Sequence, residues 1–248
     1  MSELTGLYAI WYREFKVFFR EKTRLVSSII FPLLIFFGIG RGLGPNVSIG
    51  VDYQSYIFPG ILSMTLIQTS IFFGAYIVWD RKIDFLKEVL VAPITRTTIF
   101  FGKILGGATD SMIQGSVLLL IGISIGLISN IFVVMTSLAF MFITVVGMVS
   151  VGLIIGSLMD SPHGFGLISG FLVWPLFFFS GALFPITNLP AWLKTITYVN
   201  PITYAVDGLR GATLGLNNFP LLVDFGILTF FAAVMISIGT YTFNRMKV

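Results

Sequence analysis

Charged residues are absent from long parts of this chain, and that distribution constrains the fold more than any motif. Five stretches contain no Asp, Glu, Lys or Arg: 25–40, 53–79, 111–159, 161–193 and 225–244. A charge near the centre of a membrane helix costs about 2.5–3.5 kcal/mol, so charge-free runs of this length indicate membrane spans. The pattern therefore predicts an all-α integral membrane protein.

Composition supports the same class. Hydrophobic residues make up 56% of the chain, charged residues 10%, and the mean hydropathy is +0.97, whereas soluble domains contain about 25% charged residues. The chain has no cysteine, which excludes disulfides and thiol chemistry. Its net charge of +4 is explained by orientation in the membrane, so no nucleic-acid partner is expected.

The charge-free stretches divide into six predicted spans, because one crossing takes about 20 residues. The spans are 25–43, 55–79, 106–129, 131–158, 164–184 and 221–243, with Ser129-Asn130 as the turn inside the longest stretch. Of the 15 Lys and Arg residues, only Arg41, Lys194 and Arg210 then lie outside. This asymmetry predicts a multi-pass protein of the cytoplasmic membrane with both termini in the cytoplasm.

The segment 1–24 is predicted to be an interface helix. Apolar and aromatic residues recur in it at three- and four-residue steps, with basic residues between them. Such a helix lies in the plane of the membrane surface. The segment is not a cleavable signal sequence, because its basic part is long and no small-residue cleavage site follows an apolar region.

A polar segment, 80–92, lies between the second and third spans. Apolar and charged residues separate onto two sides at helical spacing, which predicts a short amphipathic helix. Pro93 should end it, and Thr95 or Thr97 can cap the next helix. Two interpretations are open from the pattern: a docking surface for a partner, or a solvated loop lying on the bilayer.

Residues 185–220 are predicted to form an external lid of short re-entrant helices. Four prolines interrupt the segment, but 191–199 and 203–214 are apolar enough to enter the outer leaflet. Trp192, Tyr198 and Tyr204 suit the headgroup level, because their rings are apolar at one end and polar at the other.

Several residues inside the predicted spans have two interpretations each. The pairs Gly102/Gly106, Gly122/Gly126, Gly152/Gly156 and Gly166/Gly170 favour close helix packing over a substrate role. Asp110 and Asp224 are placed near the membrane boundaries. Gln68 and Gln114 either bond a neighbouring helix or face a cavity, and the aromatic residues of the fifth span contact either substrate or lipid.

The sequence argues against other classes of membrane protein. Gly102-Lys103 lacks the spacing and the following Ser or Thr of a phosphate-binding loop, so no nucleotide site is expected. An ATP-independent secondary transporter or channel, the alternative function, needs ionisable residues at mid-membrane, and these spans have almost none. A membrane enzyme needs a nucleophile–base pair or metal ligands, and the single histidine, His163, lies in a turn.

Two blocks of sequence carry a resemblance to a known family. They are Leu86-Lys-Glu-Val-Leu-Val-Ala-Pro-Ile-Thr with Gly102-Lys103 after it, and Phe179-Ser-Gly-Ala-Leu-Phe-Pro185 through Val199-Asn-Pro-Ile-Thr-Tyr-Ala-Val-Asp-Gly-Leu-Arg210. With the basic N-terminal segment and the order of spans, they resemble the type-2 ABC export permeases, most of all the branch of daunorubicin-resistance and nodulation-factor export permeases. The resemblance covers essentially the whole chain.

The resemblance implies a permease subunit that exports an amphipathic drug, lipid or lipid-linked glycan. It would pair with a second copy of itself and with two copies of a separate ATPase subunit, which binds the ATP and Mg; no cofactor is expected in this chain. The helix matching 80–92 is the coupling helix of that family. The residues implied for ATPase coupling are Asp84, Leu86, Lys87, Glu88, Leu90 and Pro93, and those implied for the translocation path are Gln68, Phe72, Phe171, Trp174 and Phe178.

The segment 80–92 departs from the family pattern in one respect. Arg81, Lys82 and Asp84 give it more charge than a minimal coupling helix carries. This leaves open which individual side chains contact the ATPase.

Overall fold

All regular elements in the described part of the chain, residues 2–46, 50–128 and 130–246 of a computed structural model, are helical. In chain order they are α1 (Glu3–Arg20), α2 (Lys22–Leu43), η1 (Gly44–Asn46), α3 (Tyr53–Phe73), α4 (Ala75–Lys82), α5 (Phe85–Val91), α6 (Arg96–Ser124), α7 (Ile131–Leu158), α8 (Pro162–Phe178), η2 (Ile186–Asn188), α9 (Ala191–Val199), α10 (Pro201–Leu214) and α11 (Leu221–Asn244). Ser129, one residue of the predicted Ser129-Asn130 turn, lies outside the described residues.

Five segments in the described ranges are long and apolar enough to cross a membrane. They are Lys22–Asn46, Tyr53–Lys82, Arg96–Ser124, Ile131–Leu158 and Leu221–Asn244. The predicted span 164–184 corresponds to α8, an apolar helix of only 17 residues. It ends at Phe178, and Gly181 in the turn that follows adopts a left-handed φ of 74°, which bends the chain before Pro185. The integral membrane class is supported, and the sixth crossing stays a prediction.

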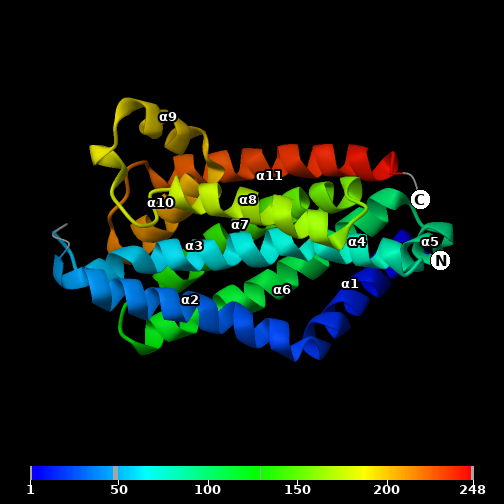
Figure 1. The fold of residues 1–248 in the computed structure, drawn as a ribbon, viewed down its shortest axis with the longest axis horizontal. Helices are drawn as coiled ribbons and strands as arrows, with labels where there is room; N and C mark the ends of the chain where they lie inside the picture. Colours follow the sequence, from blue (N-terminus) through cyan, green and yellow to red (C-terminus); the bar gives the residue numbers. More distant parts are fainter. Residues whose placement is uncertain (1, 47–49, 129, 247–248) are drawn as a thin grey trace.

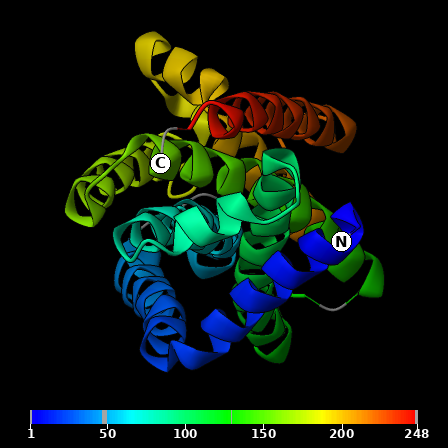
Figure 2. The ribbon, with the colours of Figure 1, turned by 90° about the vertical axis from the view of Figure 1, so that its right-hand side faces the viewer.

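The long helices run side by side along the long axis of the molecule (Figure 1). The start of α1, α5 and the end of α11 lie at one end, which we call the α5 end and which faces the viewer in Figure 2, while α9 and α10 lie toward the other (Figure 1). The centre of the bundle is α3, which packs against α2, α6, α7, α8 and α10. Most of its side chains are buried.

Glycines allow two helices to touch at the junction of α3 and α4. A Cβ on Gly152 of α7 would lie 2.4 Å from the carbonyl oxygen of Ile71, and one on Gly156 would lie 2.3 Å from that of Gly74. Backbone therefore packs directly on backbone at this crossing, as small residues permit between membrane helices.

The other predicted glycine pairs have different outcomes. Gly102 and Gly106 pack under Ile10 and Glu14 of α1, as expected for a close helix contact. Gly122 packs against Phe58, whereas its partner Gly126 forms the turn after α6 with a φ of 79°. Neither Gly166 nor Gly170 has a neighbour within 4 Å of its would-be Cβ, so the prediction of packing for this pair is not met within the described chain.

Two predicted helices are divided in the structure. The interface helix expected over 1–24 ends at Arg20, and α2 begins at Lys22 after a non-helical Glu21. The helix expected over 80–92 is split, because residues up to Lys82 complete α4 and Asp84 adopts a φ of 58° before α5. Aspartate tolerates this left-handed conformation better than most residues, which permits the sharp break.

The second motif block forms a fixed structure at the end opposite α5. The buried Arg210 of α10 donates to the carbonyl oxygens of Gly181 and Ala182 at 3.0 and 3.2 Å, and its guanidinium lies 3.8 Å from the Tyr56 ring centroid. Asn200 caps α10 and donates to the Leu176 carbonyl at 2.7 Å. These motif residues hold α10, the bend after α8 and α3 together.

Candidate functional site: the α5 end and the polar cavity

The helix α5 presents charge to solvent and seats its apolar side on the bundle. Leu86 is buried and Leu90 is half-buried against the core. Asp84, Lys87 and Glu88 are exposed, and Asp84 pairs with Lys87 at 2.7 Å. The predicted coupling residues are therefore divided between an anchoring side and an outward side.

The end of α5 follows its local sequence. Ala92, before the exposed Pro93, is extended with a ψ of 146°, as expected of a residue that precedes proline. Thr95 then caps α6 by accepting from the Thr98 amide at 3.2 Å, which confirms one of the two predicted caps.

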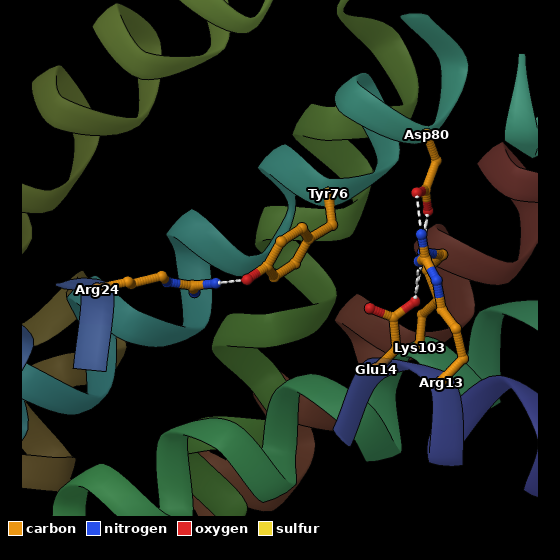
Figure 3. A network of polar contacts seen from close by, with 6 residues as sticks. All are labelled: Arg13, Glu14, Arg24, Tyr76, Asp80 and Lys103. Carbon is orange, nitrogen blue, oxygen red and sulfur yellow. Dashed lines mark hydrogen bonds and ion pairs between the residues drawn. The ribbon is translucent and has the colours of Figure 1, made fainter. Parts of the chain in front are cut away.

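Beside α5, four charged side chains form a buried ion cluster, which joins α1, α4 and α6 (Figure 3). The Lys103 Nζ atom lies 2.8 Å from Glu14 Oε1 and 2.6 Å from Asp80 Oδ2. Arg13 forms two hydrogen bonds with the Asp80 carboxylate and one with Glu14 at 2.7 Å. Two acids and two bases balance, so no net charge is buried.

The ion cluster extends to α5 through Arg13. Its guanidinium lies 4.4 Å from the centroid of the Phe85 ring, at the first position of α5, a cation–π contact. Burial alone would lower the pKa of Arg13, but its bonds to Asp80 and Glu14 raise that pKa above its ordinary value. Arg13 is thus a permanent positive charge between the cluster and α5.

Two further contacts fasten the α5 end. Arg81 donates to the carbonyl oxygens of Ser157 and Met159 at the end of α7, and pairs with Asp160 at 2.7 Å. Glu3 of α1 accepts from the Thr95 amide at 3.2 Å and from the Thr98 hydroxyl. These hydrogen bonds lower the pKa of Glu3.

A cavity of about 590 Å³ lies between the starts of α2 and α4, the α3 helix and Trp174 of α8. Between 61 and 80, the positions of α3 and α4 that are not buried are Gln68, Phe72, Ala75, Tyr76 and Trp79, and all of them line it. Because they recur at helical spacing, they form one open stripe on an otherwise buried segment. The cavity volume falls in the range of ligand sites, about 300–1,000 Å³.

The structure brings together three of the five residues predicted for the translocation path. Gln68, Phe72 and Trp174 line the cavity. Phe171 does not: it is 84% exposed and points away from the bundle. Phe178 is 43% exposed and contacts the site only by stacking on Trp174 at 5.7 Å. Phe171 and Trp174 lie three residues apart on neighbouring positions of α8, so periodicity alone did not separate them.

The mouth of the cavity toward the α5 end is polar. The Tyr76 hydroxyl accepts a hydrogen bond from Arg24 (Figure 3) and donates one to Glu21 Oε2 at 2.6 Å. The Arg24 Nη1 atom lies 3.7 Å from Glu21 Oε2. The three side chains connect the break between α1 and α2 to α4, so the cavity has a charged mouth and an aromatic interior.

The structure buries the two acids of the predicted third and sixth spans. Asp110 is 1% exposed inside the bundle, and Asp224, in the first turn of α11, is also buried. Their positions near the membrane boundaries stay a prediction. Gln114 donates to the Asp110 carbonyl of its own helix at 3.2 Å. The hydrogen bond between helices comes instead from Ser70 and Ser111, at 3.1 Å.

Sequence reasoning did not find the ion cluster, although one signal was present. Glu14 occupies the same side of α1 as Gly6 and Phe18, all three of which are buried. An acid on the buried side of an amphipathic helix requires a buried base, because an unpaired charge there is costly. No group of three or more His, Cys, Asp or Glu side chains in the described ranges is arranged to hold a metal.

Comparison with known proteins adds the decisive observation. The family model described as ABC-2 type transporter matches residues 5–214. The chain belongs to the ABC-2 transporter family.

Relatives of this ABC-2 transporter align over most of its length. It is 30% identical to the inner membrane transport permease YadH of Escherichia coli over 91% of this chain and 90% of that protein. It is 30% identical to the putative transport permease ycf38 of Cyanophora paradoxa, over 82% and 72%, and 24% identical to nodulation protein J of Rhizobium meliloti, over 96% and 92%.

Membership settles the general role. ABC-2 proteins are membrane components of ABC transporters, transport subunits rather than enzymes, and they usually pair with an ATPase subunit. The apolar helices agree with a multi-pass membrane protein. The resemblance inferred from the two sequence blocks is thereby confirmed at the level of the family.

Proposed function

We propose that this chain is the permease subunit of an ATP-driven exporter of amphipathic molecules, powered by a separate ATPase that docks on α5. The observation that carries the proposal is the combination at the α5 end. There, the exposed charged surface of α5 contacts α1 through Phe85 and Arg13, and it directly follows α4, whose Asp80 and Arg81 bind α1, α6 and α7. A loop lying passively on the bilayer does not require such anchoring.

Transmission of force from α5 follows from these contacts. Phe85 touches Arg13, and Asp80 and Arg81 at the end of α4 contact α6 and α7. A displacement of α5 therefore moves α4, which lines the cavity, and through the direct backbone contact at Gly74 it also moves α7. Packed interfaces of this kind shift between discrete arrangements rather than deforming continuously.

The topology of the proposal places the α5 end in the cytoplasm. The basic residues of α1 and of the 81–103 segment gather there, in agreement with the positive-inside rule. In this orientation α8 and the bend after it supply the sixth crossing, α9 and α10 form the external lid, and a second copy of the chain completes the pathway. The cavity then opens toward the inner leaflet, where an exported amphiphile is collected.

The experiment is transport by the intact complex, purified through a tag on this chain together with its ATP-binding subunit. Glu88→Lys reverses an exposed charge on α5 and should reduce transport per ATP hydrolysed without changing expression. Arg245→Glu reverses an exposed charge near the end of α11, at the same end of the molecule (Figure 1), and is the matched control. Equal transport by wild type and Glu88→Lys would remove Glu88 from the docking surface.

The alternative function, an ATP-independent secondary transporter or channel, predicts another result. The purified chain alone in vesicles would then show ion-driven flux. Flux at the full rate without the ATP-binding subunit would contradict the proposal.

A further inference from the structure

The surface beside the cavity mouth carries more positive than negative charge. Arg24 and Glu21 line the cavity itself, and Arg20 and Lys22 line the adjoining surface at the break between α1 and α2. Glu21 is already bonded to Tyr76. A local excess of basic side chains at a cavity mouth raises the local concentration of acidic ligands.

Arg24 has donors that its protein partners do not use. One terminal nitrogen donates to the Tyr76 hydroxyl, while Nη2 is buried and has no hydrogen-bond partner among the described residues. A guanidinium carries five N–H donors in a fork that matches the oxygens of a carboxylate or phosphate. The Arg24 side chain as a whole lines the cavity and is 26% exposed, so its accessible donors can meet an acidic group bound there.

The rest of the cavity suits the apolar part of the same ligand. Phe72 lies one turn from Tyr76 along the open stripe, and Gln68 lies a further turn away, about 12 Å from Tyr76 along the helix. Trp174 and Phe31 face the cavity from α8 and α2. The lining therefore has charged groups beside Tyr76 and aromatic side chains beyond them, with Gln68 at the far end, as a molecule with a headgroup and a largely apolar body requires.

We propose that this cavity binds an amphiphile with an acidic headgroup, a phosphate or a carboxylate, and that Arg24 is the residue that binds it. The proposal deepens the proposed function, on which it rests, by naming the chemical class of the exported molecule. An acidic lipid of the bilayer has the same chemistry, so the source of the ligand is part of the test.

The test uses the full chain in nanodiscs of phosphatidylcholine. The probe is a phosphatidic acid with a photoreactive group in its acyl chain, compared with a phosphatidylcholine carrying the same chain. Crosslinking to Phe72 or Trp174, read by mass spectrometry, reports occupancy. Wild type should prefer the acidic probe by about tenfold, because its monoester phosphate carries a net negative charge, whereas the choline cation offsets the phosphate charge of the zwitterionic probe.

Two variants, each of which removes one positive charge, distinguish specific binding at Arg24 from general electrostatic attraction of the probe to the basic surface. Arg24→Gln should weaken binding of the acidic probe by about tenfold. Lys22→Gln removes the same charge two residues away, on an exposed side chain that does not line this cavity, and should change binding by less than about threefold. Arg24→Lys keeps the charge and should restore part of the binding, which also shows that the site is folded.

If Arg24→Gln and Lys22→Gln reduce binding of the acidic probe equally, the probe is held by general attraction to the basic surface, and the proposal is overturned. Equal binding of the acidic and zwitterionic probes by wild type would overturn it as well. A final arm adds the ATP-binding subunit: ATP-driven release of the acidic probe identifies it as cargo, and binding unaffected by ATP identifies a resident lipid.

Failure of this inference and of the proposed function can be distinguished. ATP-driven transport without any preference for acidic headgroups rejects the role of Arg24 alone. Selective binding at Arg24 in a complex that transports nothing with ATP rejects the exporter and leaves a lipid site.

Discussion

Replacing Lys103 with Met tests whether the buried ion cluster holds the α5 end together. The substitution keeps the length of the side chain and removes the charge that lies 2.8 Å from Glu14 and 2.6 Å from Asp80. Asp80 keeps Arg13 as a partner, whereas Glu14 keeps one bond from a side chain that is partly exposed. The cluster is left with two acids and one base in a buried position.

The expected cost follows from burial. The Lys103 side chain is 3% exposed, and breaking a buried ion pair by removing one partner costs about 3–5 kcal/mol. Lys87→Met provides the matched control, because Lys87 lies 2.7 Å from Asp84 but is 58% exposed. Removal of an exposed pair should cost less than about 1 kcal/mol. The two substitutions are chemically identical and differ in environment alone.

The assay is equilibrium unfolding in mixed micelles by a denaturing detergent, followed by tryptophan fluorescence. The double variant Lys103→Met/Glu14→Gln removes one base and one acid and leaves Arg13 with Asp80. It should be more stable than Lys103→Met by about 1–3 kcal/mol, the usual coupling between residues in one network. A loss in Lys103→Met no larger than in Lys87→Met would refute the structural role of the cluster.

Two further predictions concern packing and pH. Gly152→Ala should destabilise the chain by about 1–3 kcal/mol in the same unfolding assay, because the new Cβ would lie 2.4 Å from the Ile71 carbonyl oxygen. Gly166→Ala is the control and should not destabilise the chain, because no atom lies within 4 Å of the position of its Cβ. The hydrogen bond from Thr98 lowers the pKa of Glu3 in the folded state. The contribution of Glu3 to folding stability is therefore fully present above its unfolded-state pKa and should be lost as pH falls through its folded-state pKa. Glu3→Gln should remove this part of the acid dependence, and an unchanged acid limb in the variant would contradict the bond to Thr98.

Features that depend on neighbouring residues could be predicted from the sequence. The fourth span was expected at 131–158 and α7 covers Ile131–Leu158, because Asn130 caps the helix and an uninterrupted apolar run follows it. The prediction that the helix ends before Pro93 is also confirmed, since α5 ends at Val91. Pro93 restricts the residue before it and Thr95 supplies a cap, and both effects are local.

Features that depend on distant partners could not be predicted. The burial of Lys103 inside α6 is one example, because Glu14 and Asp80, which neutralise it, come from other helices. The same limitation hid the packing role of Arg210, which the sequence shows only as an external charge and which also holds the Gly181 bend. The orientation of Phe171 away from the cavity depends on how α8 is rotated against α3, and composition alone does not specify that rotation.

The most direct test of the central claim, that α5 faces the cytoplasm as the docking surface of the permease, is the accessibility of a single cysteine. The chain contains no cysteine, so Glu88→Cys provides the only thiol, and Thr195→Cys on α9 reports the opposite end. With a membrane-impermeant maleimide, Glu88→Cys should react in inside-out vesicles and not in intact cells, while Thr195→Cys should react in intact cells. Labelling of Glu88→Cys from outside intact cells would contradict the account.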